Sequence, residues 1–546
     1  MDDNSRTTPQ TERDTHERPH ADEFERVQGT GCAAAFGQRS TEILDRKPWA
    51  VGNRNKGSFD RGRNPGRHEI VAAEKSVNDT NILLARAPYL TEQRVDTRTS
   101  SPARARWAYF FLLLFTLFLY ARPNDYIRNS MLLHAALITG ICAGAFYLTA
   151  LIAGKAPPVW STELKLMFLL TGWFLLGVPF SVWRSNSLDL IVQGWVKTLF
   201  IFFLITQTVL SLDRIRRLLW MIIWSELVVA GLSVVLRENI TERGQHVIQQ
   251  GDRLGGVTMG FLSANFLGIA IGMTLPFMAV LFVTRRSLLK SIVLLATCAL
   301  TMWMLVLTRS RSGLLTVLIS TALTWLLILR GRARGRVAGF ALLLMIAIAA
   351  ALAPQAFWDR VGSMWNGSDE RSGVVISAEE SVWARKDALQ HSIEFTLEHP
   401  IFGLGLGNFV VVYGSRVGKG YAWIGTHNTF TQLSSEAGIP ALLLYVAMSL
   451  VLLRNLGRIT RSLSNSPQAA ELDLLARGTI AATWSFLFGE LFAHLAYDFY
   501  FYYVIGIGIC LQVVAREIAL PPVETLKKEV AALGPGSDRA RRSWSA

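Results

Sequence analysis

Residues 132–154, LLHAALITGICAGAFYLTALIAG, decide the class of fold, because they form an apolar run about as long as a bilayer is thick. A helix needs about 20 such residues to cross roughly 30 Å of hydrocarbon. Two further runs, SIVLLATCALTMWMLVLT at 291–308 and GFALLLMIAIAAALAP at 339–354, carry no acidic or basic residue. Runs of this length are too long for ordinary core helices. The sequence therefore predicts an all-α polytopic membrane protein.

The same pattern recurs along the chain and predicts about twelve transmembrane helices. They are expected near 107–121, 131–153, 164–183, 190–210, 215–236, 261–284, 288–308, 312–330, 337–354, 437–453, 477–496 and 499–515. The first follows SPARARW with no small-residue cleavage site, so we expect a retained anchor and not a cleaved signal peptide.

The composition agrees with this class and argues against a nucleic-acid partner. Of the 546 residues, 51% are apolar and only 18% are charged. The formal net charge of +14 is spread through short loops between the predicted spans, as the positive-inside rule describes, and is not gathered into a nucleic-acid-binding patch. The four cysteines show no spacing typical of metal ligands or of a disulfide framework.

Loop charge also predicts the orientation. Arginine clusters at 214–217, 285–286, 330–336 and 454–461 all fall on one side of the membrane if the N-terminus is cytoplasmic. We therefore predict a multi-pass protein with both termini in the cytoplasm. The long connection 357–436, between the first nine spans (106–356) and the last three (437–516), must then face the exterior.

The two ends of the chain differ from the membrane region. Residues 1–105 are polar and basic without apolar periodicity, so we predict a disordered tail, and 517–546 form a cytoplasmic C-terminal tail. No methionine lies between Met1 and Met131, which leaves open an alternative start near Arg104. A cytoplasmic regulatory tail is the other interpretation.

Three arginines depart from the charge pattern. Arg253, Arg309 and Arg311 lie on the predicted outer side, beside or within spans. An arginine at membrane depth costs about 2.5–3.5 kcal/mol on insertion scales unless it snorkels or finds a partner. Snorkelling would account for one such residue, but two that flank a single serine favour an anion site, because guanidinium binds phosphate oxygens through paired hydrogen bonds. Such an anion at this depth indicates a lipid phosphate or diphosphate.

The exterior connection contains a predicted surface helix and a glycine-rich turn. SVWARKDALQHSIEFTL (381–397) places Val382, Leu389, Ile393 and Leu397 at helical spacing with polar residues opposite, which predicts an amphipathic helix along the membrane surface. GLGLG (403–407) lacks the strand and helix of a nucleotide-binding fingerprint, so we expect a tight turn.

His427, Asn428 and Glu436 precede an apolar run, where polar residues are unexpected. A lone histidine is more often structural than catalytic. Its place on the same predicted face as the arginines, however, favours a neutral imidazole that accepts a proton from a hydroxyl nucleophile. Glu436 would orient this ring or balance the guanidinium charge. The segment shows no cluster with metal-ligand spacing, so no metal is expected.

Four segments in this order carry a resemblance to a known family: RLGGVTMGFLSANFLG (253–268), TRSRSGLL (308–315), HPIFGLGLGNF (399–409) and THNTFTQLSSEAGIPALLLY (426–445). The chain resembles the O-antigen ligase/polymerase superfamily, which includes lipopolysaccharide O-antigen ligases, O-antigen polymerases and protein O-oligosaccharyltransferases. The resemblance covers about 107–516 and departs at Pro440, where a glycine is expected.

This resemblance implies a GT-C-like, metal-independent glycosyltransferase of the bacterial inner membrane that uses no cofactor. Its donor would be a glycan linked to undecaprenyl diphosphate, and its acceptor a hydroxyl of a glycan, lipid or protein at the periplasmic face. Arg309 and Arg311 match the arginines expected to hold the diphosphate, and His427 matches the histidine expected to activate the acceptor. Arg253 and Arg385 match less closely.

The sequence leaves the acceptor open among these three members of the superfamily. Two other classes also remain: a transporter or flippase for an anionic substrate, and a non-catalytic scaffold for polysaccharide assembly. Twelve spans and arginines within the membrane suit the transporter class.

Overall fold

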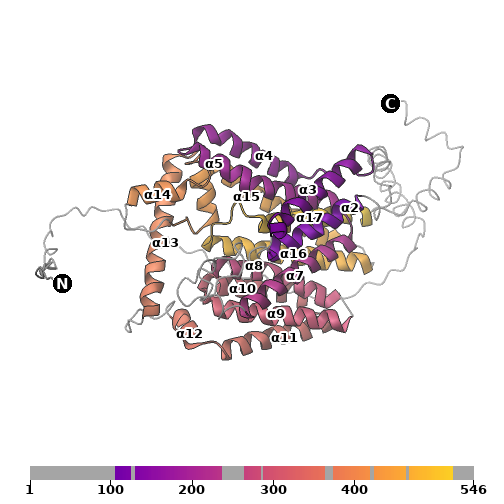
Figure 1. Cartoon of the computed structure of the whole chain (residues 1–546). Coiled ribbons are helices and arrows are strands. Elements are labelled where there is room, and N and C mark those ends of the chain that lie inside the picture. Colours follow the sequence, from indigo (N-terminus) through magenta and orange to yellow (C-terminus); the bar gives the residue numbers. More distant parts are fainter. Residues whose placement is uncertain are drawn as a thin grey trace, which may run out of the picture. The chain divides into compact units, whose positions relative to one another are not determined.

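A computed structural model describes residues 105–123, 130–235, 264–284, 287–362, 373–417, 424–462 and 467–519. Every regular element in these ranges is a helix (Figure 1). Arg253, nearly all of the predicted N-terminal tail and residues 520–546 lie outside the described residues.

Each of the twelve predicted ranges contains a helix. These helices are α2 (Arg106–Ala121), α3 (Ser130–Ile152), α4 (Thr162–Gly177), α5 (Arg184–Leu190) continued by α6 (Val196–Thr208), α7 (Leu212–Val235), α8 (Ala264–Thr284), α9 (Leu288–Thr308), α10 (Arg311–Thr324), α11 (Ala333–Ala351), α15 (Thr429–Ser462), α16 (Pro467–Gly489) and α17 (Phe499–Ala519). A π-helical turn, Ile191–Trp195, joins α5 to α6, and a second, Trp325–Leu329, extends α10.

Within the described ranges, nine helical segments are long and apolar enough to cross a membrane. The remaining three are α2, with 16 residues, and α7 and α16, which carry several charged side chains. The multi-pass helical class is therefore confirmed. A total of about twelve spans stays a prediction.

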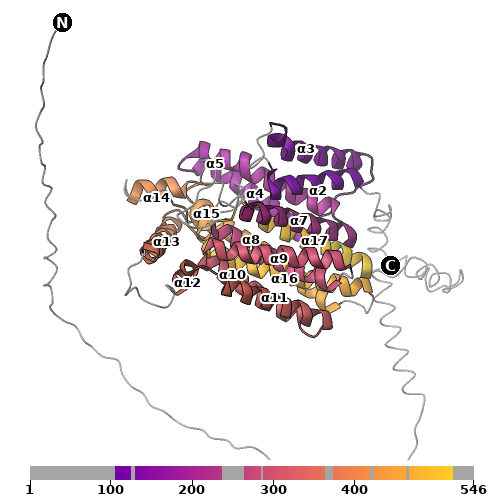
Figure 2. The same ribbon diagram turned by 60° about the horizontal axis from the view of Figure 1, so that its bottom comes forward.

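The predicted exterior connection folds into three helices at one end of the bundle. They are α12 (Gln355–Gly362), α13 (Gly373–Glu398) and α14 (Phe409–Val417). Both views show α13 lying crosswise to the ends of the long helices (Figures 1 and 2). This is the arrangement expected of a helix that lies along a membrane surface.

Helix α13 confirms the helix that the sequence predicts at 381–397. Val382, Leu389, Ile393 and Leu397 are between 38% and 73% exposed. The other face of α13 buries Ala388 and Phe395 in a small core with Leu404, Phe409 and Tyr413. The helix is thus fixed by one apolar face and leaves a second apolar stripe exposed.

The glycine-rich segment forms the expected tight turn. Gly403, Gly405 and Gly407 all have positive φ, a region that favours glycine. The turn is held against α15, because the N–H groups of Leu404 and Gly405 donate to the carbonyls of Ser435 and Glu436 at 2.8 and 2.9 Å.

Helix α15 differs from the prediction at its start. It begins at Thr429 and not near 437, and it bends at Gly438, where φ is 82°. A Cβ atom on Gly438 would lie 1.9 Å from the Ile401 carbonyl oxygen. Only a glycine therefore allows α15 to bend this close to the segment that leads into the glycine-rich turn. The first turns are polar yet largely buried, and hydropathy alone therefore misses them.

Helices α8 and α10 approach each other closely through small residues. A Cβ atom on Gly268 would lie 2.4 Å from the Gly313 Cα atom. Further along, Ser320 donates to the Gly272 carbonyl at 2.5 Å. That carbonyl lacks its usual helical partner because Pro276, four residues later, has no N–H.

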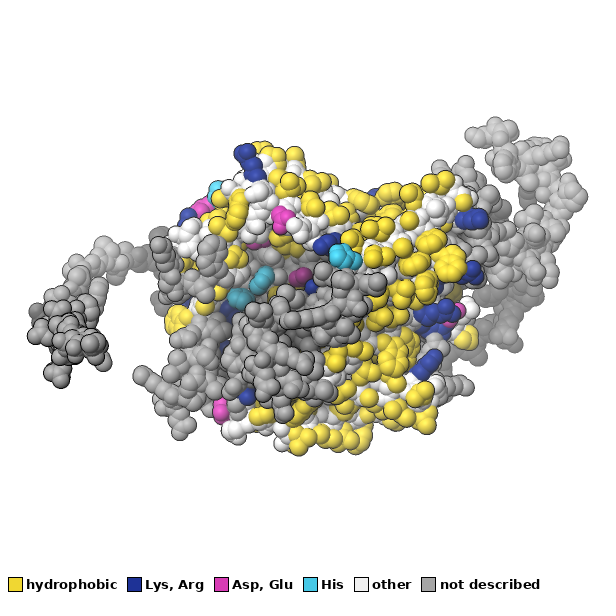
Figure 3. All heavy atoms as spheres, viewed as in Figure 1, with side chains coloured by type: hydrophobic (Ala, Val, Ile, Leu, Met, Phe, Trp, Pro, Cys, Tyr) yellow, Lys and Arg dark blue, Asp and Glu magenta, His cyan; other side chains and the backbone are white. Residues whose placement is uncertain are grey.

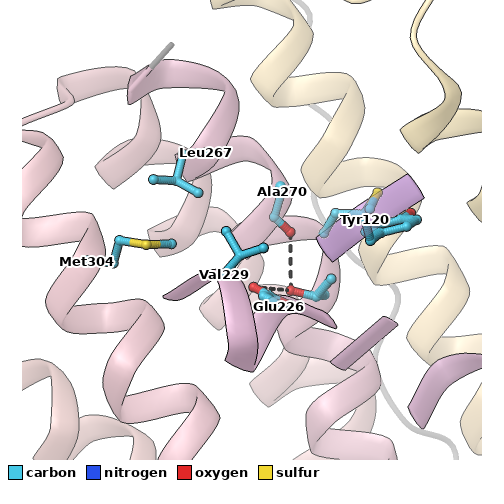
Figure 4. A pocket seen from close by; sticks show the side chains of 8 residues that line it. Tyr120, Glu226, Val229, Leu267, Ala270 and Met304 are labelled. Carbon is cyan, nitrogen blue, oxygen red and sulfur yellow. Dashed lines mark hydrogen bonds between the residues drawn. The ribbon is translucent and has the colours of Figure 1, made fainter. Parts of the chain in front are cut away.

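A small internal cavity lies between α2, α7, α8 and α9 (Figure 4). Its volume is about 10 Å³, and Thr274 donates to a Glu226 carboxylate oxygen beside it at 3.0 Å. The lining includes no arginine or histidine, so this cavity is not the candidate site.

We expect Gly268→Ala to destabilise the protein, because the added methyl group would force α8 away from Gly313. Overpacking of this kind costs about 1–3 kcal/mol, and thermal unfolding of the purified protein in detergent would measure it. Gly172→Ala in α4 is the matched control, since a Cβ there has open space. An unchanged melting temperature for Gly268→Ala would contradict the close contact.

Candidate functional site

The two arginines between α9 and α10 belong to a strained turn, residues 308–313, that we call the arginine turn. Arg309 has φ 48°, a left-handed conformation that is uncommon for any residue with a side chain. Helix α10 starts at Arg311, and the preceding Ser310 caps it by accepting a hydrogen bond from the Gly313 N–H at 3.1 Å. Cap and strain together fix the direction of the backbone at both arginines.

The serines of this turn anchor it to α8. The hydroxyls of Ser310 and Ser312 both donate to Oδ1 of Asn265, at 2.6 and 3.0 Å. Gly313 then packs against Gly268 on the same helix. The Ser-Arg-Ser-Gly pattern thus has a physical explanation: the small residues bind inward and both arginines remain partly exposed.

His427 also lies in a strained turn, directly before α15. Its φ is 52°. Asn428 caps the helix, since its side-chain oxygen accepts hydrogen bonds from the N–H groups of Phe430 and Thr431 at 2.9 and 3.1 Å. Asn428 therefore supports the site by fixing the backbone next to the histidine.

Glu436 is buried and holds the glycine-rich turn. Its carboxylate accepts hydrogen bonds from the Phe409 N–H at 3.3 Å and from the Tyr497 hydroxyl at 2.8 Å. These contacts give Glu436 a structural role in joining the turn to the chain beside α17. The predicted contact with the His427 ring stays a prediction.

Electrostatic effects connect α13 to both turns. Burial, followed by the positive charge of Arg311, lowers the pKa of Arg385 on α13. Burial, then the neighbouring His494, then Arg385 lower the pKa of His427 to about 3. Arg385 therefore lies near both Arg311 and His427, although the three residues are far apart in the sequence. Arg309 occupies the same turn as Arg311, and Arg253 lies outside the described residues.

His494 is a site residue that sequence reasoning missed. Its ring packs edge-to-face against that of His427, with the ring centroids 5.4 Å apart and the planes at 69°. The sequence pattern placed His494 inside a predicted span at 477–496, but α16 ends at Gly489 and His494 lies in the turn before α17. Figure 3 shows histidine side chains recessed in a hollow of the molecular surface.

This arrangement defines a class of site: cationic guanidinium groups beside a neutral imidazole, at one end of a multi-pass helical protein. Guanidinium groups bind anions, and a neutral imidazole can accept a proton.

The family comparison agrees with this class. Residues 296–446 match the family model described as O-Antigen ligase, which supports membership of the O-antigen ligase superfamily. The matched segment contains Arg309, Arg311, Arg385 and His427. No curated protein matches the chain.

The lowered pKa of His427 predicts a pH effect on stability. Between pH 6.5 and about 3 the unfolded chain binds a proton at this residue that the folded protein does not bind. The folded state therefore loses stability as pH falls below 6.5. We expect His427→Gln to weaken this loss, so that its melting temperature rises relative to the parent between pH 7 and pH 5. If the melting temperatures of His427→Gln and the parent changed equally between pH 7 and pH 5, His427 would titrate normally.

Proposed function

We propose that this protein is a glycosyltransferase of the O-antigen ligase type. It transfers a glycan from undecaprenyl diphosphate to an acceptor hydroxyl at the periplasmic face of the bacterial inner membrane, in surface polysaccharide biosynthesis. The observation that carries the proposal is the grouping of Arg311, Arg385 and His427 in the segment that matches the family.

The arginines supply the donor site in this proposal. A diphosphate carries its charge on planar sets of oxygens, which guanidinium groups can bind in pairs. Arg309 and Arg311 would hold the diphosphate, and Arg385 would approach it from α13. The two like charges of Arg311 and Arg385 repel each other, and an anion between them would remove that repulsion.

His427 is the base of the reaction. The acceptor hydroxyl loses its proton to the His427 imidazole as its oxygen forms a bond to the anomeric carbon. The bond from that carbon to the diphosphate oxygen breaks, and undecaprenyl diphosphate leaves with the electron pair. The arginines stabilise the charge that develops on the leaving group. A direct displacement of this kind inverts the anomeric centre and requires no nucleotide.

The donor itself would make His427 a better base. Burial and His494 lower the pKa of His427 most, and the positive charge of Arg385 lowers it further. A bound diphosphate would offset this positive charge and add a negative one, and an opposite charge favours the protonated imidazole. The histidine would thus gain proton affinity only when a donor is in place.

A transporter for anionic substrates is the candidate from another class. Secondary transporters commonly hold their substrate near the middle of the membrane, between repeated halves. Here the group of Arg311, Arg385 and His427 includes a residue of α13, which lies crosswise at one end of the bundle (Figure 1). This position favours transfer at a membrane surface.

The acceptor distinguishes the possible members of the superfamily. In a deletion strain, loss of capped chains from lipid A would indicate a ligase. Products with a single repeat unit would indicate a polymerase, and unmodified proteins would indicate a protein O-oligosaccharyltransferase.

The purified protein should transfer glycan from lipid-linked donor to acceptor without nucleotide or added metal. We expect His427→Ala to slow transfer by roughly 10²–10⁴-fold, the usual loss for a general base. Arg311→Ala should slow it by about 10²–10³-fold, by analogy with oxyanion-hole donors. Product formation measured by mass spectrometry would test both values.

Matched controls separate these effects from general damage. His399→Ala and Arg416→Ala replace exposed residues of the same exterior connection and should leave the rate unchanged. Full activity of His427→Ala would refute the proposed base. Translocation of substrate that persists in His427→Ala, without transfer, would favour the transporter.

We expect donor binding to shift the pH dependence of the reaction. The rate should fall as pH drops through the pKa of His427, because the protonated ring cannot accept a proton. The apparent pKa in kcat, which reports the donor complex, should exceed that in kcat/KM, which reports the free enzyme. If kcat and kcat/KM fell with the same apparent pKa on the acidic side, the activation of His427 by the donor would be contradicted.

A further inference from the structure

His494 contacts both halves of the candidate site. Its ring packs against His427 on one side and, at 5.5 Å and 76°, against Phe266. Phe266 directly follows Asn265, the residue that anchors both serines of the arginine turn. His494 therefore lies between α8, the helix that anchors the arginine turn, and the turn that carries His427.

The backbone on either side of His494 is tied to the start of α15. The Thr429 hydroxyl donates to the Ala493 carbonyl at 2.8 Å and accepts from the Leu495 N–H at 2.9 Å. These two bonds hold the residues immediately before and after His494. Thr429 is itself two residues beyond His427, so its hydroxyl holds the two histidines opposite each other.

The ring of His494 also fills the space that a side chain at position 425 would need. A Cβ atom on Gly425 would lie 2.8 Å from Cε1 of His494 and 3.0 Å from its Nδ1. The turn that leads to His427 thus rests on this ring. The Nδ1 atom is buried and has no hydrogen-bond partner among the described residues, so packing holds that side of the ring.

We propose that His494 is a positioning residue that sets the place of the His427 imidazole relative to the arginine turn. The inference rests on the proposed function, because positioning matters only if His427 acts on a donor held by the arginines. A base displaced by about 1 Å can lose about 10²-fold in rate. The contacts of His494 with Gly425, His427 and Phe266 prevent such a displacement.

The test compares His494→Ala with His494→Phe in the transfer assay. We expect His494→Ala to lower kcat by about 10²-fold and to leave the KM for the lipid-linked donor nearly unchanged, since the arginines remain. His494→Phe keeps an aromatic ring against Gly425 and should restore most of kcat. The exposed histidine variant His399→Ala is the control.

A second variant approaches the same contact from the other side. Gly425→Ala pushes a methyl group into the His494 ring and should also lower kcat. Because both changes act on one contact, the double variant Gly425→Ala/His494→Ala should lose less than the product of the two single losses. If His494→Ala fails to fold, Gly425→Ala alone tests the contact, and wild-type kcat in that variant would overturn the inference.

Wild-type kcat in folded His494→Ala would overturn the inference, and so would a folded His494→Phe as slow as His494→Ala. Neither outcome affects the proposed function, which fails if the purified protein transfers no glycan or if His427→Ala or the arginine variants retain full transfer.

Discussion

The site depends on holding two guanidinium groups, Arg311 and Arg385, close together at the end of a membrane bundle. Burial disfavours the positive charge of Arg385, and the like charge of Arg311 adds to this effect. Side chains that repel each other stay together only if the surrounding structure fixes their backbones. The arginine turn meets this requirement through Asn265 and the Gly268–Gly313 contact, and α13 meets it by burying Phe395.

Helices α13 and α14 and the bend in α15 extend the same constraint to His427. Gly438 bends α15 around the Ile401 carbonyl, and Glu436 holds the Phe409 N–H. These contacts join the glycine-rich turn, the base of α13 and the start of α15 into one unit. The backbones that carry Arg385 and His427 are thus held by packing and by hydrogen bonds within the protein, which do not require a bound substrate.

The sequence predicts the helices better than it predicts their ends. Apolar runs locate the spans because hydropathy records contact with lipid, and the spacing of Val382, Leu389 and Ile393 reveals α13. The polar start of α15 and the turn around His494 escape this reasoning, because their polar groups are satisfied inside the protein by Asn428 and Thr429. A single sequence contains no signal for such long-range hydrogen bonds.

The residues of the candidate site likewise fall into two groups, those that the sequence reveals and those that it does not. Arg309 and Arg311 stand out in the sequence because charge at membrane depth is costly, and His427 stands out because it precedes an apolar run. Asn265 and His494 do not stand out, since each is an ordinary polar residue within a predicted span, 261–284 for Asn265 and 477–496 for His494. Their importance follows only from three-dimensional contacts with Ser310 and with His427.

The electrostatics of the free protein also bear on the order of events in the proposed reaction. With a pKa near 3, His427 is neutral at neutral pH but has little affinity for a proton. An acceptor, or water, that enters before the donor would meet a base too weak to activate it. A diphosphate bound by the arginines would oppose this condition, because the anion that supplies the leaving group also stabilises the imidazolium. The charge that makes the empty site unfavourable would then couple donor binding to acceptor activation.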